Sequence, residues 1–201
     1  MTNYFRCLQI PIKTHFSRLA KTTADDAQVY DYISGTNLLS TITGTQSARS
    51  FTYDADGNVS RDGSRTLAYN QDNRLKQISE DKDELASYRY NIFGQRTYKS
   101  TPDGGIILYH YDLQGNLIAE SDPLGNILRK YVYIGNHRLA VIESDPFQIE
   151  DVYFYINDHL GRAVKIMDFQ GNPVWSADYM PFGRAYIDQN MIENHFRFPG
   201  Q

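Results

Sequence analysis

Residues 51–59 read Phe-Thr-Tyr-Asp-Ala-Asp-Gly-Asn-Val. The pattern returns at 88–96 as Tyr-Arg-Tyr-Asn-Ile-Phe-Gly-Gln-Arg and at 109–117 as Tyr-His-Tyr-Asp-Leu-Gln-Gly-Asn-Leu. A weaker copy fills 67–75, and more divergent copies begin near Tyr30, Tyr131, Tyr153 and Tyr179. The repeated tyrosine falls at positions 32, 53, 69, 90, 111, 133, 155 and 179, so most copies lie 21 or 22 residues apart. Such self-similarity indicates a repeat protein, in which each unit packs on its neighbours.

Each copy has the composition of a strand, a turn and a second strand. Tyrosine and β-branched residues, which favour strands, flank an Asp-x-x-Gly core that suits a type I turn with a left-handed glycine. We therefore predict an all-β chain of consecutive antiparallel hairpins, with positive φ at Gly57, Gly94 and Gly115 and with Asn73 in the equivalent place. The repeat-motif residues are Tyr53, Asp54, Gly57, Asn58, Tyr69, Tyr90, Gly94, Tyr111, Asp112, Gly115 and Asn116.

The Tyr-x-Tyr pairs, such as Tyr109 with Tyr111, predict aromatic rows, because residues i and i+2 of a strand share a face. These rows are interpreted as a packing ladder, with a sugar-binding platform as the alternative. We expect the face bearing Tyr111, Tyr133, Tyr155 and Trp175 to be partly uncovered. We also expect the unpaired edges of the sheet to promote self-association.

Segments outside the clear repeats carry weaker signals. Residues 3–20 are expected to form a short helix or an irregular lead-in, and the charged segment Glu80–Leu85 a longer loop. The net charge of −4 does not favour a nucleic-acid partner. No run approaches a membrane span and no secretory signal is evident, so the sequence assigns no localisation. The single cysteine, Cys7, excludes an internal disulfide.

Longer stretches resemble the YD-repeat, or RHS, family. Asn37–Gly44, Arg49–Asn58 and Asp62–Tyr69 are similar to its repeats, and the C-terminal part is similar to the RHS-associated core. There Asp-His-Leu-Gly stands at 158–161, Pro-Phe-Gly at 181–183 after a tryptophan, and Arg-Phe-Pro-Gly at 197–200. The core-signature residues are Asp158, His159, Leu160, Gly161, Trp175, Pro181, Phe182, Gly183, Arg197, Phe198, Pro199 and Gly200.

The resemblance implies a part of a hollow β-shell that in bacterial relatives encloses a C-terminal toxin used against other cells. It divides the chain into a lead-in at 1–27, YD repeats at 28–144 and the start of the core at 145–201. Family cores continue beyond a residue equivalent to Gln201 into an autocleavage motif and a toxin, so the remaining shell and toxin are the implied partners. Such relatives are commonly exported or lie at the cell surface. The alternative function is a repeat module that binds carbohydrate or a cell surface.

Enzyme chemistry finds little support in the sequence, and we expect no catalytic residue, cofactor or metal. Asp122–Asn126 is similar to the family's cleavage motif but has the composition of an ordinary turn, which leaves a self-cleaving remnant as a third reading. Asp54 and Asp56 could begin a calcium loop, but the position that requires glutamate is Arg65. The histidines, including His159, show no zinc-site spacing.

Overall fold

The computed structural model describes residues 17–20, 28–44, 48–135, 137–145, 147, 149–179 and 185–196. The described residues form strands and turns without a helix, as the repeat pattern predicts. The strands are β1 (Ser17–Ala20), β2 (Gln28–Tyr32), β3 (Leu39–Gly44), β4 (Arg49–Tyr53), β5 (Val59–Asp62), β6 (Arg65–Tyr69), β7 (Leu75–Glu80), β8 (Asp83–Tyr90), β9 (Arg96–Thr101), β10 (Gly105–Tyr111), β11 (Leu117–Ser121), β12 (Ile127–Ile134), β13 (His137–Ser144), β14 (Glu150–Asn157), β15 (Ala163–Met167), β16 (Pro173–Tyr179) and β17 (Ala185–Asn190).

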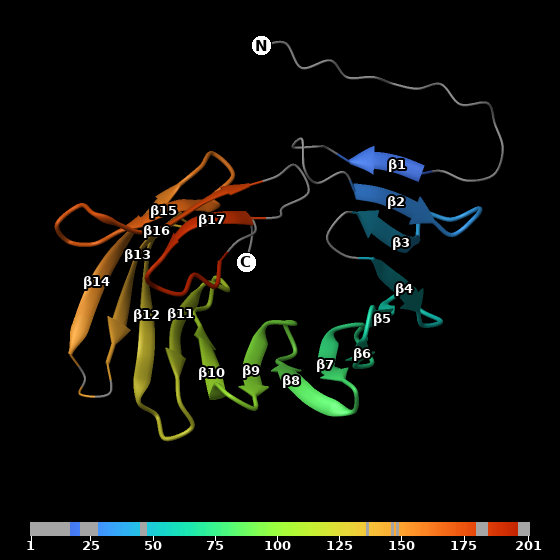
Figure 1. Ribbon diagram of the computed structural model, residues 1–201. Helices are drawn as coiled ribbons and strands as arrows, with labels where there is room; N and C mark the ends of the chain where they lie inside the picture. The colour runs from blue at the N-terminus through green and yellow to red at the C-terminus, as the bar shows by residue number, and fades with distance from the viewer. Residues whose placement is uncertain are drawn as a thin grey trace, which may run out of the picture. The chain divides into compact units, whose positions relative to one another are not determined.

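The chain divides into two compact units, residues 1–87 and 88–201. In the first unit, successive strands from β1 to β8 pair antiparallel, each with the next along the chain. In the second unit, β9 to β17 do the same, and Figure 1 shows these strands in chain order. The hairpin interpretation is therefore confirmed.

A β-bulge accompanies most of the repeat turns. The register shifts between Thr52 and Tyr53 in the β4–β5 hairpin, and between His110 and Tyr111 in the β10–β11 hairpin. Gly57, Gly94 and Gly115 have φ values of 85°, 78° and 90°, and Asn73 has 56°. These angles confirm the predicted left-handed positions, which a glycine adopts at no steric cost.

The segment Glu80–Leu85 is a tight hairpin, so the expectation of a longer loop was wrong. Glu80 pairs directly with Asp83, and the two residues between them, Asp81 and Lys82, have φ values of 49° and 81°. Positive φ at both central residues defines a type I′ turn, whose twist matches that of the flanking strands. The charge of the segment concealed this turn, because the usual Asn-Gly or Asp-Gly signal is missing.

Part of the predicted lead-in is also a strand. Ser17–Ala20 forms β1, which pairs with β2 from Ser17 opposite Asp31 to Ala20 opposite Gln28. The helix or irregular segment expected at 3–20 is therefore wrong for these four residues. Residues 3–16, with His15 and Cys7, lie outside the described residues.

The core of the second unit lies on one face of its sheet. Its buried residues are Tyr109, Leu117, Tyr131, Val141, Tyr155, Ala163, Ile166, Val174, Trp175, Ala177 and Phe196. Trp175 and Ile166 have no exposed surface, and Tyr155 is 9% exposed. The expectation of a partly uncovered face is therefore wrong at Tyr155 and Trp175, while Tyr111 and Tyr133 stay partly exposed.

Candidate functional site

The repeat turns form a self-contained hydrogen-bonded unit. The Oδ1 of Asp112 accepts hydrogen bonds from the backbone N–H of Gln114 at 2.9 Å and of Asn116 at 2.8 Å. The Nδ2 of Asn116 donates to Asp112 Oδ2 at 2.9 Å, and the N–H of Gly115 donates to the Asp112 carbonyl at 3.1 Å. Asp54 and Asn58 make the same bonds. Asp, Gly and Asn at this spacing therefore specify a turn in which the Asp side chain accepts hydrogen bonds from groups of the same turn.

The segment similar to the cleavage motif has this turn too. Asp122 Oδ1 accepts from the N–H groups of Leu124 and Asn126, both at 2.9 Å, and Gly125 has φ 90°. Asn126 Nδ2 donates to Asp122 Oδ2 at 2.8 Å. The side-chain oxygens of Asp122 are thus engaged within the turn, in agreement with its interpretation as an ordinary turn.

These bonds lower the pKa of the turn aspartates below the ordinary value of 3.8. At Asp54, Asp112, Asp122 and Asp168, the main cause is the hydrogen bond from the asparagine four residues on. A pKa lower in the folded chain than in the unfolded chain means that the charged form stabilises the fold. This stability is complete above the unfolded pKa and is lost as the pH falls through the folded pKa.

We expect thermal stability to decline as the pH falls below about 3.8, because the turn aspartates then take up protons. Asp112→Asn is the matched variant, since Asn70 and Asn91 already serve as acceptors in equivalent turns. It should fold at neutral pH and show a smaller loss of melting temperature in acid. An unchanged acid profile, measured by circular dichroism, would contradict the role of this carboxylate.

The left-handed glycine gives a second test of the turn. A Cβ at Gly57 would meet no atom within 4 Å, so only its φ of 85° opposes a side chain. Gly57→Val should lower the free energy of unfolding by about 1–2 kcal/mol. Gly57→Asn should cost less, because Asn73 adopts this conformation in the next copy. Urea denaturation measures both, and equal costs would contradict a backbone origin.

In five of the copies, the hydroxyl of the repeated tyrosine joins its hairpin to the preceding one. The hydroxyl of Tyr111 donates to the Arg96 carbonyl at 2.9 Å, and that of Tyr133 to the Leu117 carbonyl at 3.0 Å. Each acceptor is the first residue after the preceding repeat turn. Equivalent bonds run from Tyr53 to Leu39, from Tyr69 to Val59 and from Tyr179 to Ala163. Because a bulge disrupts the ladder beside these turns, the hydroxyl supplies a donor where strand pairing is interrupted.

Asn157 takes this role in the hairpin where the sequence interpretation had placed Tyr155. Its Nδ2 donates to the Arg138 carbonyl at 2.8 Å, whereas Tyr155 lies two residues earlier in the buried core. The signal was present in the sequence, because Asn157 precedes Asp158 as Tyr111 precedes Asp112. The role of Asn157 was missed because the position was assigned by the repeated tyrosine and not by the residue that directly precedes the turn.

The core-signature residues lie at two described places. Asp158, His159, Leu160 and Gly161 form the β14–β15 turn. There Asp158 Oδ1 accepts from the N–H of Leu160 and Arg162, and Gly161 has φ 77°. His159 and Leu160 are exposed at its tip. Trp175 is in β16 and is completely buried. The other signature residues, Pro181, Phe182, Gly183, Arg197, Phe198, Pro199 and Gly200, lie outside the described residues.

The segment after β17 returns across the sheet face and covers the core (Figure 1). Phe196 is buried there, with its ring 5.0 Å from that of Tyr131 in an edge-to-face arrangement. The guanidinium carbon of Arg138 lies over the ring of Phe196, 3.1 Å from the ring centre. Asn194 Oδ1 accepts from the Phe196 N–H at 3.0 Å. This segment therefore supplies the cover that the sequence did not predict for Trp175 and Tyr155.

A buried charge network holds the covering segment to β11 and β12. Glu120 of β11 is 1% exposed and accepts from the Tyr131 hydroxyl at 2.8 Å. Its Oε1 lies 3.2 Å from His195 Nδ1, and its Oε2 lies 3.6 Å from Arg129 Nη1. His195 Nε2 also faces Glu193 Oε1 at 3.1 Å. Arg129 Nη1 also lies 3.2 Å from Nδ1 and 3.1 Å from Nε2 of His195.

The electrostatics of this network favour charged carboxylates. Burial alone would raise the pKa of Glu120, but the contacts with His195, Tyr131 and Arg129 outweigh it and hold the pKa below 4.5. Arg129 Nε lies 2.7 Å from Glu143 Oε1. Burial lowers the pKa of Arg129, but the nearby carboxylates, Glu143 among them, outweigh burial and raise it. Burial and the nearby Glu120 charge raise the Tyr131 pKa well above 10. Sequence reasoning missed this network, whose members lie up to 75 positions apart.

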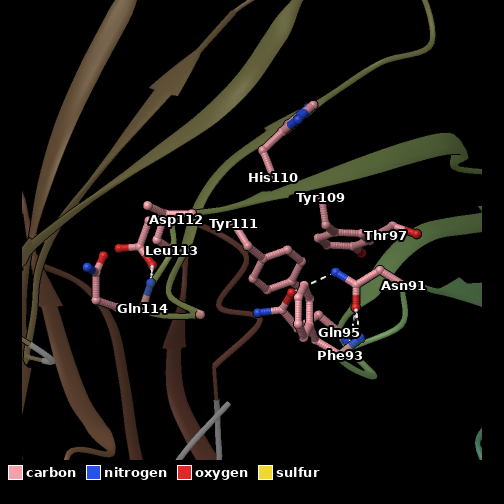
Figure 2. Close-up of a pocket in the computed structure, with 11 residues that line it drawn as sticks. Asn91, Phe93, Gln95, Thr97, Tyr109, His110, Tyr111, Asp112, Leu113 and Gln114 are labelled. Carbon is pink, nitrogen blue, oxygen red and sulfur yellow. Dashed lines mark hydrogen bonds between the residues drawn. The ribbon is translucent and has the colours of Figure 1, made fainter.

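A groove of about 640 Å³ lies between the turns at 91–95 and 112–116 (Figure 2). Tyr109, Tyr111 and Phe93 line it, together with Leu113 at the neighbouring tip. Its polar side chains are largely engaged. Asn91 Nδ2 donates to Gln95 Oε1 at 2.7 Å, Tyr111 donates to a carbonyl, and His110 Nε2 bonds Ser121 at 2.8 Å.

Within the described ranges, no group of three or more His, Cys, Asp or Glu side chains is arranged to hold a metal ion. The same residues include no helix that is long and apolar enough to cross a membrane.

The fold and its ties define a class of protein, a tyrosine-repeat sheet built from bulged hairpins. Residues 152–187 match the family model described as RHS protein. This match agrees with the resemblance of the repeats and of the core signature to the RHS/YD-repeat family.

Comparison with curated proteins finds tRNA nuclease WapA of Bacillus subtilis strain 168, 26% identical over 191 residues. The tRNA3(Ser)-specific nuclease WapA of Bacillus spizizenii is 25% identical over 191 residues. Each match covers 92% of this chain and 8% of the relative, so the chain spans a small part of the relatives' length.

Two solved structures share the fold. The Photorhabdus luminescens Tc holotoxin pore, which contains TccC3, has a TM-score of 0.52 at 15% identity over 80% of this chain. A TcdB2–TccC3–TEV crystal structure has a TM-score of 0.55 at 14% identity over 87% of this chain. These matches cover 10% and 11% of the respective solved chains.

Proposed function

We propose that this chain is a non-enzymatic wall segment of an RHS shell, which encloses a toxin and helps to deliver it. The observation that carries the proposal is the run of tyrosine and asparagine ties, each joining one hairpin to the preceding one. These hydrogen bonds make a continuous sheet rigid, and they do not form an active-site cleft. The functional residues of the wall are then the repeat-motif and core-signature residues, which act by holding the sheet together.

The relatives support a toxin-related context. They are named as tRNA nucleases, and this chain is similar to about one-twelfth of their length. We infer that a toxin activity, if it accompanies this wall, lies in residues other than these 201, and that the whole protein acts in competition between bacteria. The net charge of −4 agrees with this, because contact with tRNA phosphates calls for a basic surface.

Carbohydrate binding receives less support. The groove beside Tyr111 has aromatic rings, but the polar side chains of Asn91, Tyr111 and His110 are engaged within the sheet. Sugar recognition needs polar groups that can turn toward a ligand. A wall segment therefore accounts for more of the structure.

Electron microscopy of the product of the complete coding region tests the proposal. We expect a hollow particle, with residues 88–196 in its wall. A particle without an internal cavity would overturn enclosure. In parallel, the 201-residue chain should leave total tRNA intact, and cleavage that persists through further purification would overturn the non-enzymatic assignment.

A further inference from the structure

The covering segment at 193–196 lies on the core through its side chains. These four residues, all of them described by the structure, belong to no strand. The chain leaves the sheet after Met191, whose N–H donates to the Val174 carbonyl at 2.9 Å. The segment then meets the core through the ring of Phe196 and the imidazole of His195. A segment attached in this way can open locally, because the hydrogen bonds of the strand ladder beneath it are made among the strands.

Ionisable groups from several strands surround the covering segment. Glu120 of β11 faces His195, with its Oε1 3.2 Å from Nδ1, and Arg129 of β12, with its Oε2 3.6 Å from Nη1. Within the segment, Glu193 Oε1 lies 3.1 Å from His195 Nε2. The other ionisable groups that interact with this cluster or with Phe196 are Lys99 of β9, Tyr109 and Tyr111 of β10, Tyr131 of β12, Arg138 and Glu143 of β13, and Tyr155 of β14.

The balance of charge in this cluster changes sign in acid. At neutral pH the guanidinium of Arg129 lies among the charged carboxylates of Glu120, Glu143 and Glu193. Burial raises the pKa of Glu120 and of Glu193, but His195 and the other contacts outweigh it and hold both pKa values below 4.5. The attraction is therefore complete above the unfolded pKa and is lost as the pH falls through the folded pKa.

Neutral carboxylates would leave two cations face to face. Histidine is protonated in the acid range in which carboxylates titrate. Both ring nitrogens of His195 lie close to Arg129 Nη1, with Nδ1 at 3.2 Å and Nε2 at 3.1 Å. Like charges at this separation repel each other, and the repulsion pushes the imidazole away from β12.

We propose that the covering segment is an acid-released strap, which lies closed over the core at neutral pH and opens in acid while the strands beneath it stay paired. The strap opens first because it depends on one charge cluster, whereas the hairpins are held by strand pairing in addition to their turns. Opening uncovers the aromatic face that carries Tyr131, Tyr155 and Trp175. This device goes beyond the proposed wall function and does not depend on it.

Fluorescence of Trp175 reports the opening, because it is the single tryptophan of the chain and has no exposed surface. Acrylamide quenching of the 201-residue chain, measured from pH 7 to about 3, should rise at a pH at which the circular dichroism of the sheet is unchanged. Return to pH 7 should restore the low quenching. If quenching rises only together with the loss of circular dichroism, the chain unfolds as a whole and the proposal is overturned.

Two variants change the cluster in opposite directions. Glu120→Gln keeps an acceptor for the Tyr131 hydroxyl but carries no charge, so Trp175 should be more accessible to acrylamide at pH 7 and the rise in acid should be smaller. His195→Gln replaces the imidazole by a neutral donor and removes the repulsion from Arg129, so the opening midpoint should shift to lower pH. A contact that only fills space would give the opposite shift, because its loss would open the segment at a higher pH.

The matched control is Glu150→Gln, which removes one member of the exposed pair with Lys130 and should follow the quenching profile of the parent chain. A Glu120→Gln chain that folds and keeps the parent profile would overturn the proposal. So would a His195→Gln chain whose midpoint does not move to lower pH. If Glu120→Gln fails to fold, His195→Gln decides alone, because it changes a side chain that is 15% exposed at the edge of the cluster.

Discussion

Replacing Glu120 by alanine should lower the free energy of unfolding by about 3–5 kcal/mol, because one partner of a buried charge pair is lost. The carboxylate is 1% exposed and accepts from Tyr131 while facing His195 and Arg129. Without it, the Tyr131 hydroxyl loses its acceptor, Arg129 loses a nearby buried carboxylate, and His195 loses its contact with Oε1. The covering segment at 193–196 should loosen first, and urea denaturation with hydrogen exchange measures both effects.

Two variants separate charge from volume. Glu120→Gln keeps the shape and an acceptor for Tyr131, so it should cost about 1.5–3 kcal/mol, in the range of hydrogen bonds to charged groups. Glu150→Gln removes one member of the exposed pair with Lys130 and should cost less than about 1 kcal/mol. If Glu120→Ala costs no more than Glu150→Gln, the network does not hold the segment.

The hairpins could be read from the sequence because their determinants are local. Asp112, Gly115 and Asn116 lie within five residues and specify the turn by bonds among themselves. The type I′ turn at Asp81 and Lys82 was missed for the opposite reason, since neither residue is a usual signal for left-handed backbone. Its geometry follows from the pairing of β7 with β8.

The position of the covering segment at 193–196 could not be predicted from local sequence in the same way. Phe196 meets Tyr131, and His195 meets Glu120, across 65 and 75 positions of chain. Neither β11 nor the segment after β17 has a sequence pattern that predicts the contact between them. A glutamate in a strand is ordinarily a surface residue, so no sequence pattern predicted that Glu120 is buried.

Replacing Trp175 by alanine should lower the free energy of unfolding by about 3–5 kcal/mol, the usual cost of emptying a buried aromatic site. Trp175 has no exposed surface and packs in the cluster that Phe196 closes. The loss should extend beyond β16, because Tyr155 of β14 and Ile166 of β15 belong to the same cluster. Denaturant unfolding measures the cost, and the control Ile187→Ala, at a 37% exposed residue of the adjacent β17, should lose less than about 2 kcal/mol.

Trp175→Phe distinguishes packing from polarity at the same site. The indole Nε1 of Trp175 is buried and has no hydrogen-bond partner among the described residues. A buried donor without a partner costs about 1–3 kcal/mol, so removing it offsets part of the volume lost with the smaller ring. Trp175→Phe should therefore cost less than half as much as Trp175→Ala. If the two variants lose equal stability, the indole N–H has a partner in solution and contributes to the stability of the fold through it.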